Sequence, residues 1–275
     1  MRISISNIAW DVSEDKKILN LLKEFHIDAI DIVPGKYFRN PEITTDREIN
    51  IIKNWWFKNG IEIIGMQSLL FNKSNMNIFG TKETRLIMLD YLKSICHIGN
   101  VIGAKRIVFG SPKNRNSKGL SNKETEKIAI DFFNRLGDIA IKENVIICLE
   151  PCPVQYGCNF MNTSFETAKI VTKILHPAIK MQLDTGAINM NNEDVLKIFS
   201  NYSAYIGHIH ISEPNLIPLG DGTDDHINYS KIIKKYPPKS IVSIEMLATK
   251  KETHFASIRR ALMFANRVYR PLSNI

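Results

Sequence analysis

Short apolar runs alternate with longer amphipathic segments along the whole chain. The runs have the length of strands, and the segments between them carry apolar residues at helical spacing. Eight strands are predicted, at residues 3–7, 29–33, 61–66, 106–109, 145–150, 179–184, 206–211 and 241–245. Eight helices are predicted, at residues 13–25, 46–59, 82–100, 122–143, 164–175, 193–201, 229–236 and 251–268. The chain is therefore expected to be built from βα units.

This alternation favours a (β/α)₈ barrel of the α/β class. No linker and no shift of composition separates two halves, so residues 1–275 are expected to form a single domain. A doubly wound open sheet is the alternative, because periodicity does not determine whether a sheet closes. The long predicted loops all follow strands, where a barrel places its active site. They span residues 69–81, 111–121, 151–163 and 212–228.

The composition is typical of a globular protein. With 44% hydrophobic and 23% charged residues, a disordered or collagen-like chain is excluded. No apolar run approaches the roughly 18 residues of a membrane span, and no signal-peptide pattern is found. We expect a cytoplasmic protein with no membrane partner and with its four cysteines reduced. Cys152 and Cys158 lack the spacing of a CxxC pair, so a zinc site there is the weaker interpretation.

Four successive predicted strands end in side chains that can bind a metal: Glu150, Asp184, His210 and Glu245. Burying an uncompensated charge costs several kcal/mol, so these groups need a partner. Oxygen-rich ligands with one imidazole suit Mn²⁺, which we favour, with Mg²⁺, Co²⁺, Fe²⁺ or Zn²⁺ as alternatives. The other interpretation is four separate polar groups, each satisfied by backbone and water.

The residues two positions before these four are expected to face the barrel interior, one layer deeper, because side chains alternate along a strand. They are Cys148, Gln182, His208 and Ser243. A purely structural layer would consist of Val, Ile or Leu. We therefore expect the polar members of this layer, above all Gln182 and His208, to orient the metal ligands.

The motifs LEP at 149–151, LDT at 183–185, GHIH at 207–210 and SIE at 243–245 resemble a known family. It is the sugar phosphate isomerase/epimerase family, with the xylose isomerase-like TIM barrel. The resemblance spans essentially the whole chain, and the motifs are spaced by about one βα unit each. The ordered Glu, Asp, His, Glu set is specific for the superfamily but not for a substrate.

The resemblance implies a mechanism. In related ketose 3-epimerases the metal holds two adjacent sugar oxygens, one glutamate removes a proton, and a second returns it on the opposite face. Carried over, Glu150 and Glu245 are the acid/base pair as well as ligands, and Asp184 and His210 are ligands only. Elementary chemistry agrees, because enediolate formation needs a positioned base and a cation. The prediction is a divalent-metal-dependent isomerase or epimerase of a sugar or sugar phosphate.

Two departures from those epimerases concern the substrate. They usually have a histidine three residues after the metal-binding aspartate and an arginine soon after the metal-binding histidine. This chain has Ala187 and Leu216 there, which argues against a plain free-ketohexose epimerase. Glu213 matches the acidic position after the histidine and is expected to bind a sugar hydroxyl. The alternative for Glu213 is a loop carboxylate that faces water.

Further candidates for substrate binding are Trp10, Gln67, Lys113 and Arg115. Lys113 and Arg115 lie in a turn after the fourth strand and suit a phosphate or uronate group, although loop cations are often only solvated. His226, beside two aspartates, is a candidate for a second cation. A solvated acidic turn is the simpler interpretation of that segment.

The net charge of the chain suggests a rival function. The charge of +8, from 36 Lys+Arg and 28 Asp+Glu, invites a nucleic-acid partner, and an abasic-site endonuclease shares the superfamily fold. Such an enzyme needs extra histidines where this chain has Gln67, Phe109 and Ala187, and the basic residues are scattered, so no nucleic acid is expected.

Two other rivals use the same residues. A metal-dependent dehydratase of a cyclic polyol or keto acid would share the four ligands. A non-catalytic carbohydrate-binding protein is disfavoured because both glutamates are present. The family resemblance also allows a homo-oligomer, but no sequence feature determines its stoichiometry.

Overall fold

Eight parallel strands form a closed barrel in the computed structural model, which describes residues 1–236 and 241–270. Each strand pairs with the next along the chain, and β1 also pairs with β8. Closure confirms the predicted barrel and excludes the open sheet. The strands are β1 (Arg2–Ser6), β2 (Ala29–Ile32), β3 (Glu62–Met66), β4 (Arg106–Phe109), β5 (Ile146–Leu149), β6 (Ile179–Asp184), β7 (Ile206–Ile211) and β8 (Ile241–Ile244).

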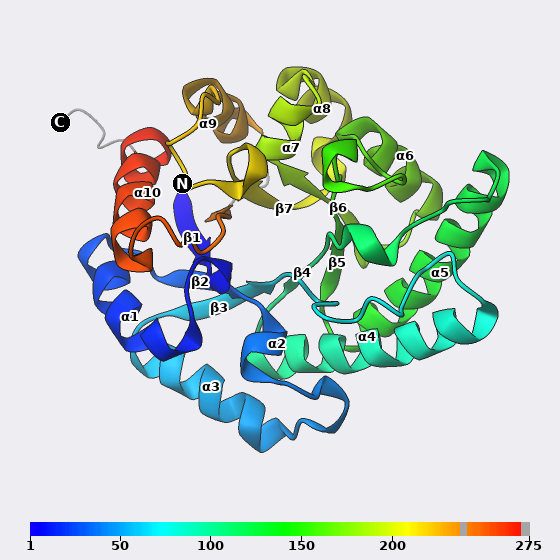
Figure 1. Cartoon of the computed structure of the whole chain (residues 1–275), viewed down its shortest axis with the longest axis horizontal. Helices are drawn as coiled ribbons and strands as arrows, with labels where there is room; N and C mark the ends of the chain where they lie inside the picture. The colour runs from blue at the N-terminus through cyan, green and yellow to red at the C-terminus, as the bar shows by residue number, and fades with distance from the viewer. Residues whose placement is uncertain (237–240, 271–275) are drawn as a thin grey trace.

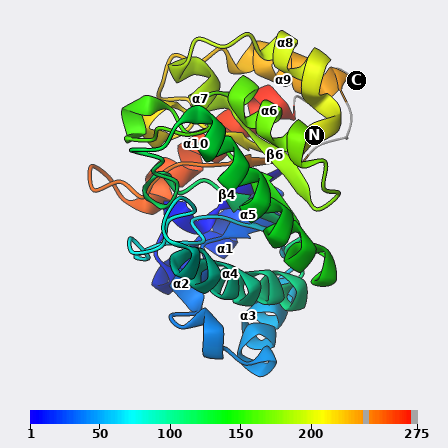
Figure 2. The same ribbon diagram turned by 90° about the vertical axis from the view of Figure 1, so that its right-hand side faces the viewer.

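The helices form a ring around the strands (Figure 1). Eight of them correspond to the eight predicted helices. These are α1 (Asp15–Glu24), α3 (Asp46–Lys58), α4 (Lys82–Ile102), α5 (Asn122–Lys142), α6 (Ser164–Ile174), α8 (Val195–Tyr202), α9 (His226–Lys235) and α10 (His254–Tyr269). In the side view, the long helices α4 and α5 run next to each other (Figure 2). Among the described residues, no helix is both long and apolar enough to cross a membrane.

Two short helices were not predicted, α2 (Pro34–Tyr37) and α7 (Thr185–Met190). Helix α7 begins directly at the end of β6, without an intervening loop. The Asp184 side chain is its N-cap and accepts a hydrogen bond from the Ala187 N–H. Asp184 therefore ends β6 and caps α7. No loop sequence separates the two elements, so the start of α7 is not marked in the sequence.

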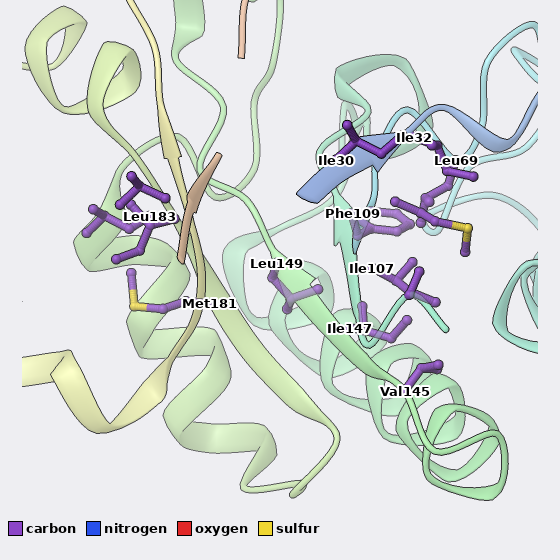
Figure 3. Packing of buried hydrophobic residues seen from close by; sticks show 14 of the residues in the cluster. Ile30, Ile32, Leu69, Ile107, Phe109, Val145, Ile147, Leu149, Met181 and Leu183 are labelled. Carbon is purple, nitrogen blue, oxygen red and sulfur yellow. The ribbon is translucent and has the colours of Figure 1, made fainter. Parts of the chain in front are cut away.

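The outward-facing residues of the strands form the hydrophobic core beneath the helices. Ile107 and Phe109 of β4 lie near Ile147 and Leu149 of β5 (Figure 3). The alternate positions face the barrel interior and are largely polar at the carboxyl half of the strands, with Gln182 fully buried there. The apolar core between strands and helices thus stabilises the barrel from outside. The polar side chains packed inside the barrel are therefore available to support a site at its carboxyl end.

Replacing the fully buried Ile107 by alanine should lower the free energy of unfolding by about 2–5 kcal/mol, because it leaves a cavity under the helices. Ile141 on α5 is 48% exposed, and Ile141→Ala is the matched control, with an expected cost below about 1 kcal/mol. Denaturant unfolding followed by circular dichroism measures both. Equal losses in the two variants would contradict this packing.

Candidate metal centre

The structure brings the four predicted ligands together at the carboxyl end of the barrel. Glu150 follows β5, Asp184 ends β6, His210 lies in β7 and Glu245 follows β8. One potential ligand atom from each lies within 4.8 Å of the others. His210 Nδ1 is 3.1 Å from Glu245 Oε2 and 3.3 Å from Glu150 Oε1. These groups converge because parallel strands end at the same rim of the barrel.

The centre concentrates negative charge in a buried place. Burial and the negative charge of Glu245 raise the pKa of Asp184 to about 7. Glu150 Oε1 is buried and accepts no hydrogen bond from any residue that the structure describes. Three carboxylates with an unpartnered oxygen beside one imidazole form a donor set that a divalent cation satisfies. The residues present therefore fit a divalent metal.

Asp184 is held in place by groups outside the cluster. Its Oδ1 accepts the Ala187 N–H at 2.6 Å, and its Oδ2 accepts the Ser212 hydroxyl at 2.9 Å. Ser212 also accepts the Gly186 N–H, so it joins the end of β7 to the start of α7. These bonds hold the carboxylate in one orientation without adding charge.

His210 is supported from behind by Asp31, a residue that the sequence analysis missed. Asp31 is fully buried in β2, and its Oδ2 lies 2.7 Å from His208 Nε2 and 3.6 Å from His210 Nε2. Burial opposes ionisation, but the charge and hydrogen bond of His208 hold the pKa of Asp31 below its ordinary value. The sequence signal was an acidic residue at an inward position of a strand between two isoleucines.

The imidazole of His210 is electrostatically coupled to the carboxylates. Burial alone would lower its pKa, but the negative charge of Glu245 and the contact with Asp31 raise it well above its ordinary value. A positive charge is therefore favoured beside Nδ1, which is the nitrogen that faces the two glutamates. A divalent cation is one way to supply that charge.

The polar layer below the centre orients the ligands. Gln67, predicted to bind substrate, donates from Nε2 to Glu245 Oε1 at 2.7 Å. Gln182, with its amide oxygen turned toward β7, accepts the His210 backbone N–H at 3.1 Å and donates to the His208 carbonyl at 3.2 Å. The structure therefore places Gln67 in the supporting layer, together with Gln182 and His208.

Two glycines make room for the buried carboxylates. A Cβ atom at Gly110 would lie 1.9 Å from Glu150 Oε2, and one at Gly65 would lie 2.5 Å from Asp31 Oδ1. No side chain larger than hydrogen fits at these two positions beside the present carboxylate positions. The glycines on β3 and after β4 thus belong to the construction of the centre.

A cavity of about 380 Å³ opens above the four groups. Apart from Glu150, Asp184 and Glu245, its walls are largely apolar. They include Pro112, Pro151, Cys152, Tyr156, Ala187, Leu216 and Leu247. A larger cavity of about 580 Å³ lies elsewhere and is lined by residues such as Phe57, Lys105 and Ile241, which begins β8. It contains none of the four clustered groups, so the smaller cavity is the candidate substrate site.

The remaining predicted substrate residues lie as follows. Trp10 is buried and donates from Nε1 to Asp15 Oδ1 at 2.8 Å. Arg115 is also fully buried, and its guanidinium donates to the carbonyl of Glu150 at 2.7 Å and to that of Gly110 at 3.0 Å. The structure thus places Arg115 beneath the centre as an anchor for the loop after β5. Lys113, in the 3₁₀ segment η4 (Pro112–Asn114), is exposed.

Glu213 does not face water. It is 1% exposed, and its Oε1 accepts the Gly220 N–H at 2.9 Å and lies 3.1 Å from His226 Nε2. His226 is buried as well, although Asp221 and Asp225 in the same segment are exposed. The loop after β7 therefore folds over its own carboxylate.

Eight parallel strands close into a barrel, and a Glu, Asp, His, Glu cluster that could hold a metal ion lies at the carboxyl ends of β5 to β8. The protein is therefore a TIM barrel with a candidate metal centre. The chain belongs to the xylose isomerase-like TIM barrel family, whose family model matches residues 19–265.

Known proteins agree with this assignment. L-ribulose 3-epimerase from Methylomonas sp. (strain DH-1) is 24% identical over 131 residues, which cover 48% of this chain and 46% of that protein. The match therefore spans less than half of the relative. D-psicose 3-epimerase with D-tagatose from Clostridium cellulolyticum H10 superposes with a TM-score of 0.80 at 17% identity, covering 98% of this chain and 99% of that one. The IOLI protein with a bound zinc atom superposes with a TM-score of 0.75 at 16% identity, covering 100% of both chains.

Gly110→Ala should displace the Glu150 carboxylate, because the new methyl group would overlap Oε2. We expect Mn²⁺ affinity, measured by isothermal titration calorimetry, to fall by about tenfold or more. Gly35→Ala is the control, since nothing lies within 4 Å of a Cβ there. Unchanged affinity in Gly110→Ala would argue against Glu150 as a ligand in this position.

Asp31→Asn should weaken Mn²⁺ binding by about 10–100-fold, because it removes the charge that orients His208 and His210. The exposed Asp90 on α4 offers the matched control Asp90→Asn. Titration calorimetry and thermal unfolding of both variants separate weaker binding from misfolding. Equal affinities in the two folded variants would refute the supporting role of Asp31.

Proposed function

We propose that this protein is a divalent-metal-dependent epimerase or isomerase that acts on a sugar or sugar phosphate. The observation that carries the proposal is the placement of two glutamates beside one imidazole nitrogen at the base of the cavity. His210 Nδ1 lies 3.1 Å from Glu245 Oε2 and 3.3 Å from Glu150 Oε1, and both glutamates line the cavity. The similarity to L-ribulose 3-epimerase and to D-psicose 3-epimerase supports this class of reaction.

Glu150, Asp184, His210 and Glu245 would hold the ion, for which Mn²⁺ is our first choice. The zinc atom bound in the IOLI protein supports a divalent cation in this fold and keeps Zn²⁺ as the alternative. When bound, the ion supplies Lewis-acid stabilisation of negative charge on substrate oxygens. The hydrogen bond from Gln67 to Glu245 and the ionic contact between Asp31 and His210 hold these ligands in position for it.

The two glutamates would carry the proton transfers. One carboxylate takes the proton from the carbon beside the substrate carbonyl, and the other delivers a proton to the opposite face. Glu245 is oriented by the amide of Gln67. The loop that begins at Glu150 is anchored by Arg115, which binds the Glu150 carbonyl. Glu245 is thus fixed at its carboxylate and Glu150 at its backbone, each by a hydrogen bond from a neighbouring side chain.

The cavity walls favour a substrate with few hydroxyls on the side away from the metal. Ala187 and Leu216, in place of a histidine and an arginine, line the cavity together with Leu247. These side chains offer no hydrogen bonds to a free ketohexose. Lys113 is exposed next to the lining residue Pro112 and is our candidate for binding a phosphate or carboxylate group of the substrate.

All four cysteines are free thiols. This supports the proposal that the enzyme works in a reducing compartment such as the cytoplasm.

Glu150→Gln and Glu245→Gln should each abolish epimerisation, because a carboxamide cannot accept or deliver the proton. The assay incubates ketoses, aldoses and their phosphates with the Mn²⁺-loaded enzyme in D₂O and follows deuterium uptake by mass spectrometry and NMR. The wild type should incorporate deuterium beside the carbonyl and invert that carbon. The variant that keeps the proton-abstracting glutamate should still exchange the proton without inversion.

Glu83→Gln, at an exposed position on α4, is the control and should behave as wild type. The metal content of every variant is measured, so that loss of the ion is told apart from loss of the base. Full epimerisation by either glutamine variant would overturn the two-glutamate scheme. Net loss of water from a substrate would instead identify a dehydratase.

A further inference from the structure

A second group of metal-capable side chains lies outside the centre described above. Glu213 follows β7, Asp224 lies in the loop that comes after it, and His226 begins α9. One potential ligand atom from each lies within 4.8 Å of the other two. The group is linked to the first centre through α7, whose Asn189 amide donates to Asp224 Oδ1. The proposed reaction uses none of these three residues, although the sequence already made His226 a candidate for a second cation.

The imidazole of His226 is held as a metal-binding imidazole usually is. The residue is only 2% exposed, and its ring stands edge-on to the rings of Tyr229 and Phe264. Its Nδ1 lies 2.6 Å from the hydroxyl of the buried Tyr269, and its Nε2 points toward Glu213. A histidine that ligates a metal typically uses its second ring nitrogen to bind an oxygen atom, as Nδ1 does here.

Two carboxylate oxygens of the group are buried without a partner. Glu213 Oε2 and Asp224 Oδ2 accept no hydrogen bond from any residue within 1–236 or 241–270. Glu213 is 1% exposed, so water does not readily compensate its charge. An unpaired buried carboxylate oxygen is costly, and a second carboxylate nearby increases the cost.

The charges around Asp224 also favour a cation at this group. Burial, followed by the negative charges of Glu213 and Asp184, raises the pKa of Asp224 to about 7. Gly222 leaves space at Glu213, because a Cβ atom there would lie 2.0 Å from Oε2. The loop therefore brings two carboxylates close together, and the missing Cβ of Gly222 accommodates the Glu213 carboxylate.

We propose that Glu213, Asp224 and His226 bind a second divalent transition-metal cation. Two carboxylates and one imidazole form a donor set that suits Mn²⁺ or Zn²⁺ better than Ca²⁺. Nε2 of His226 would exchange its contact with Glu213 for the cation, and the tyrosine hydroxyl of Tyr269 would keep the ring in place. The inference does not depend on the proposed reaction.

Such an ion would act on the wall of the substrate cavity. The loop that starts at Glu213 continues into the 3₁₀ segment η7 (Pro214–Leu216), and Asn215 and Leu216 line the cavity. A cation bound between this loop and the start of α9 would cross-link the two and fix that wall. It would also reduce the negative charge beside Asp184.

The test counts ions on the full-length chain. The protein is stripped with a chelator, dialysed against Mn²⁺ or Zn²⁺, and its metal content per chain is measured by mass spectrometry. The wild type should hold two ions, whereas Asp224→Asn and His226→Gln should hold one. His210→Gln should also retain one ion, at the second site. The double variant His210→Gln/Asp224→Asn should hold none.

Circular dichroism and thermal unfolding check that each variant is folded. If His226→Gln does not fold, Tyr269→Phe keeps the imidazole and removes only its oxygen partner, and it should weaken the second binding step by about tenfold in titration calorimetry. A wild type that takes up one ion at saturating Mn²⁺ and Zn²⁺ would overturn the proposal. Two ions in the folded Asp224→Asn and His226→Gln variants would do so as well. Either result would leave hydrogen bonding within the loop as the role of the group.

Discussion

Three carboxylates that crowd together at the carboxyl end of the barrel repel one another, and the residues around them are arranged to offset that repulsion. Glu150, Asp184 and Glu245 meet at the rim of the barrel beside His210, and Asp184 and Glu245 are buried there. The raised pKa of Asp184, caused by burial and by the negative charge of Glu245, expresses the cost of that arrangement. Positive charge must be supplied locally, and the donor atoms are those that a divalent cation prefers.

Much of the barrel interior serves to keep these groups in place. Asp31 supports the histidines from β2, Gln67 supports Glu245 from just after β3, and Arg115 anchors the start of the loop after β5. Gly110 and Gly65 lie where a Cβ atom would overlap the carboxylates of Glu150 and Asp31. A centre assembled this way loses little orientation entropy when it binds an ion or a substrate, because its ligands are already held in their positions.

The same electrostatic problem recurs in the loop after β7. Glu213 and Asp224 bring two more carboxylates close to the first centre, again with one histidine beside them. Both groups combine carboxylates with an imidazole whose second nitrogen lies near an oxygen, of Asp31 in one case and of Tyr269 in the other. The shared construction is the reason to consider a cation at each.

The eight βα units and the four clustered residues could be predicted from the sequence, because strand period and strand ends are local properties of the chain. Closure of the sheet was favoured by the sequence but is established by the pairing of β1 with β8. The sequence indicated Gln182 and His208 as supports of the ligands, but it revealed neither α7, nor Asp31, nor the contact of Gln67 with Glu245. His208 and Asp31 are 177 positions apart, and Gln67 and Glu245 are 178 apart. Arg115, read as a loop cation, is buried beneath the centre, and Glu213 and His226 form a buried pair. These contacts form only when the barrel closes and loops from distant strands fold over its rim, so local patterns in the sequence do not contain them.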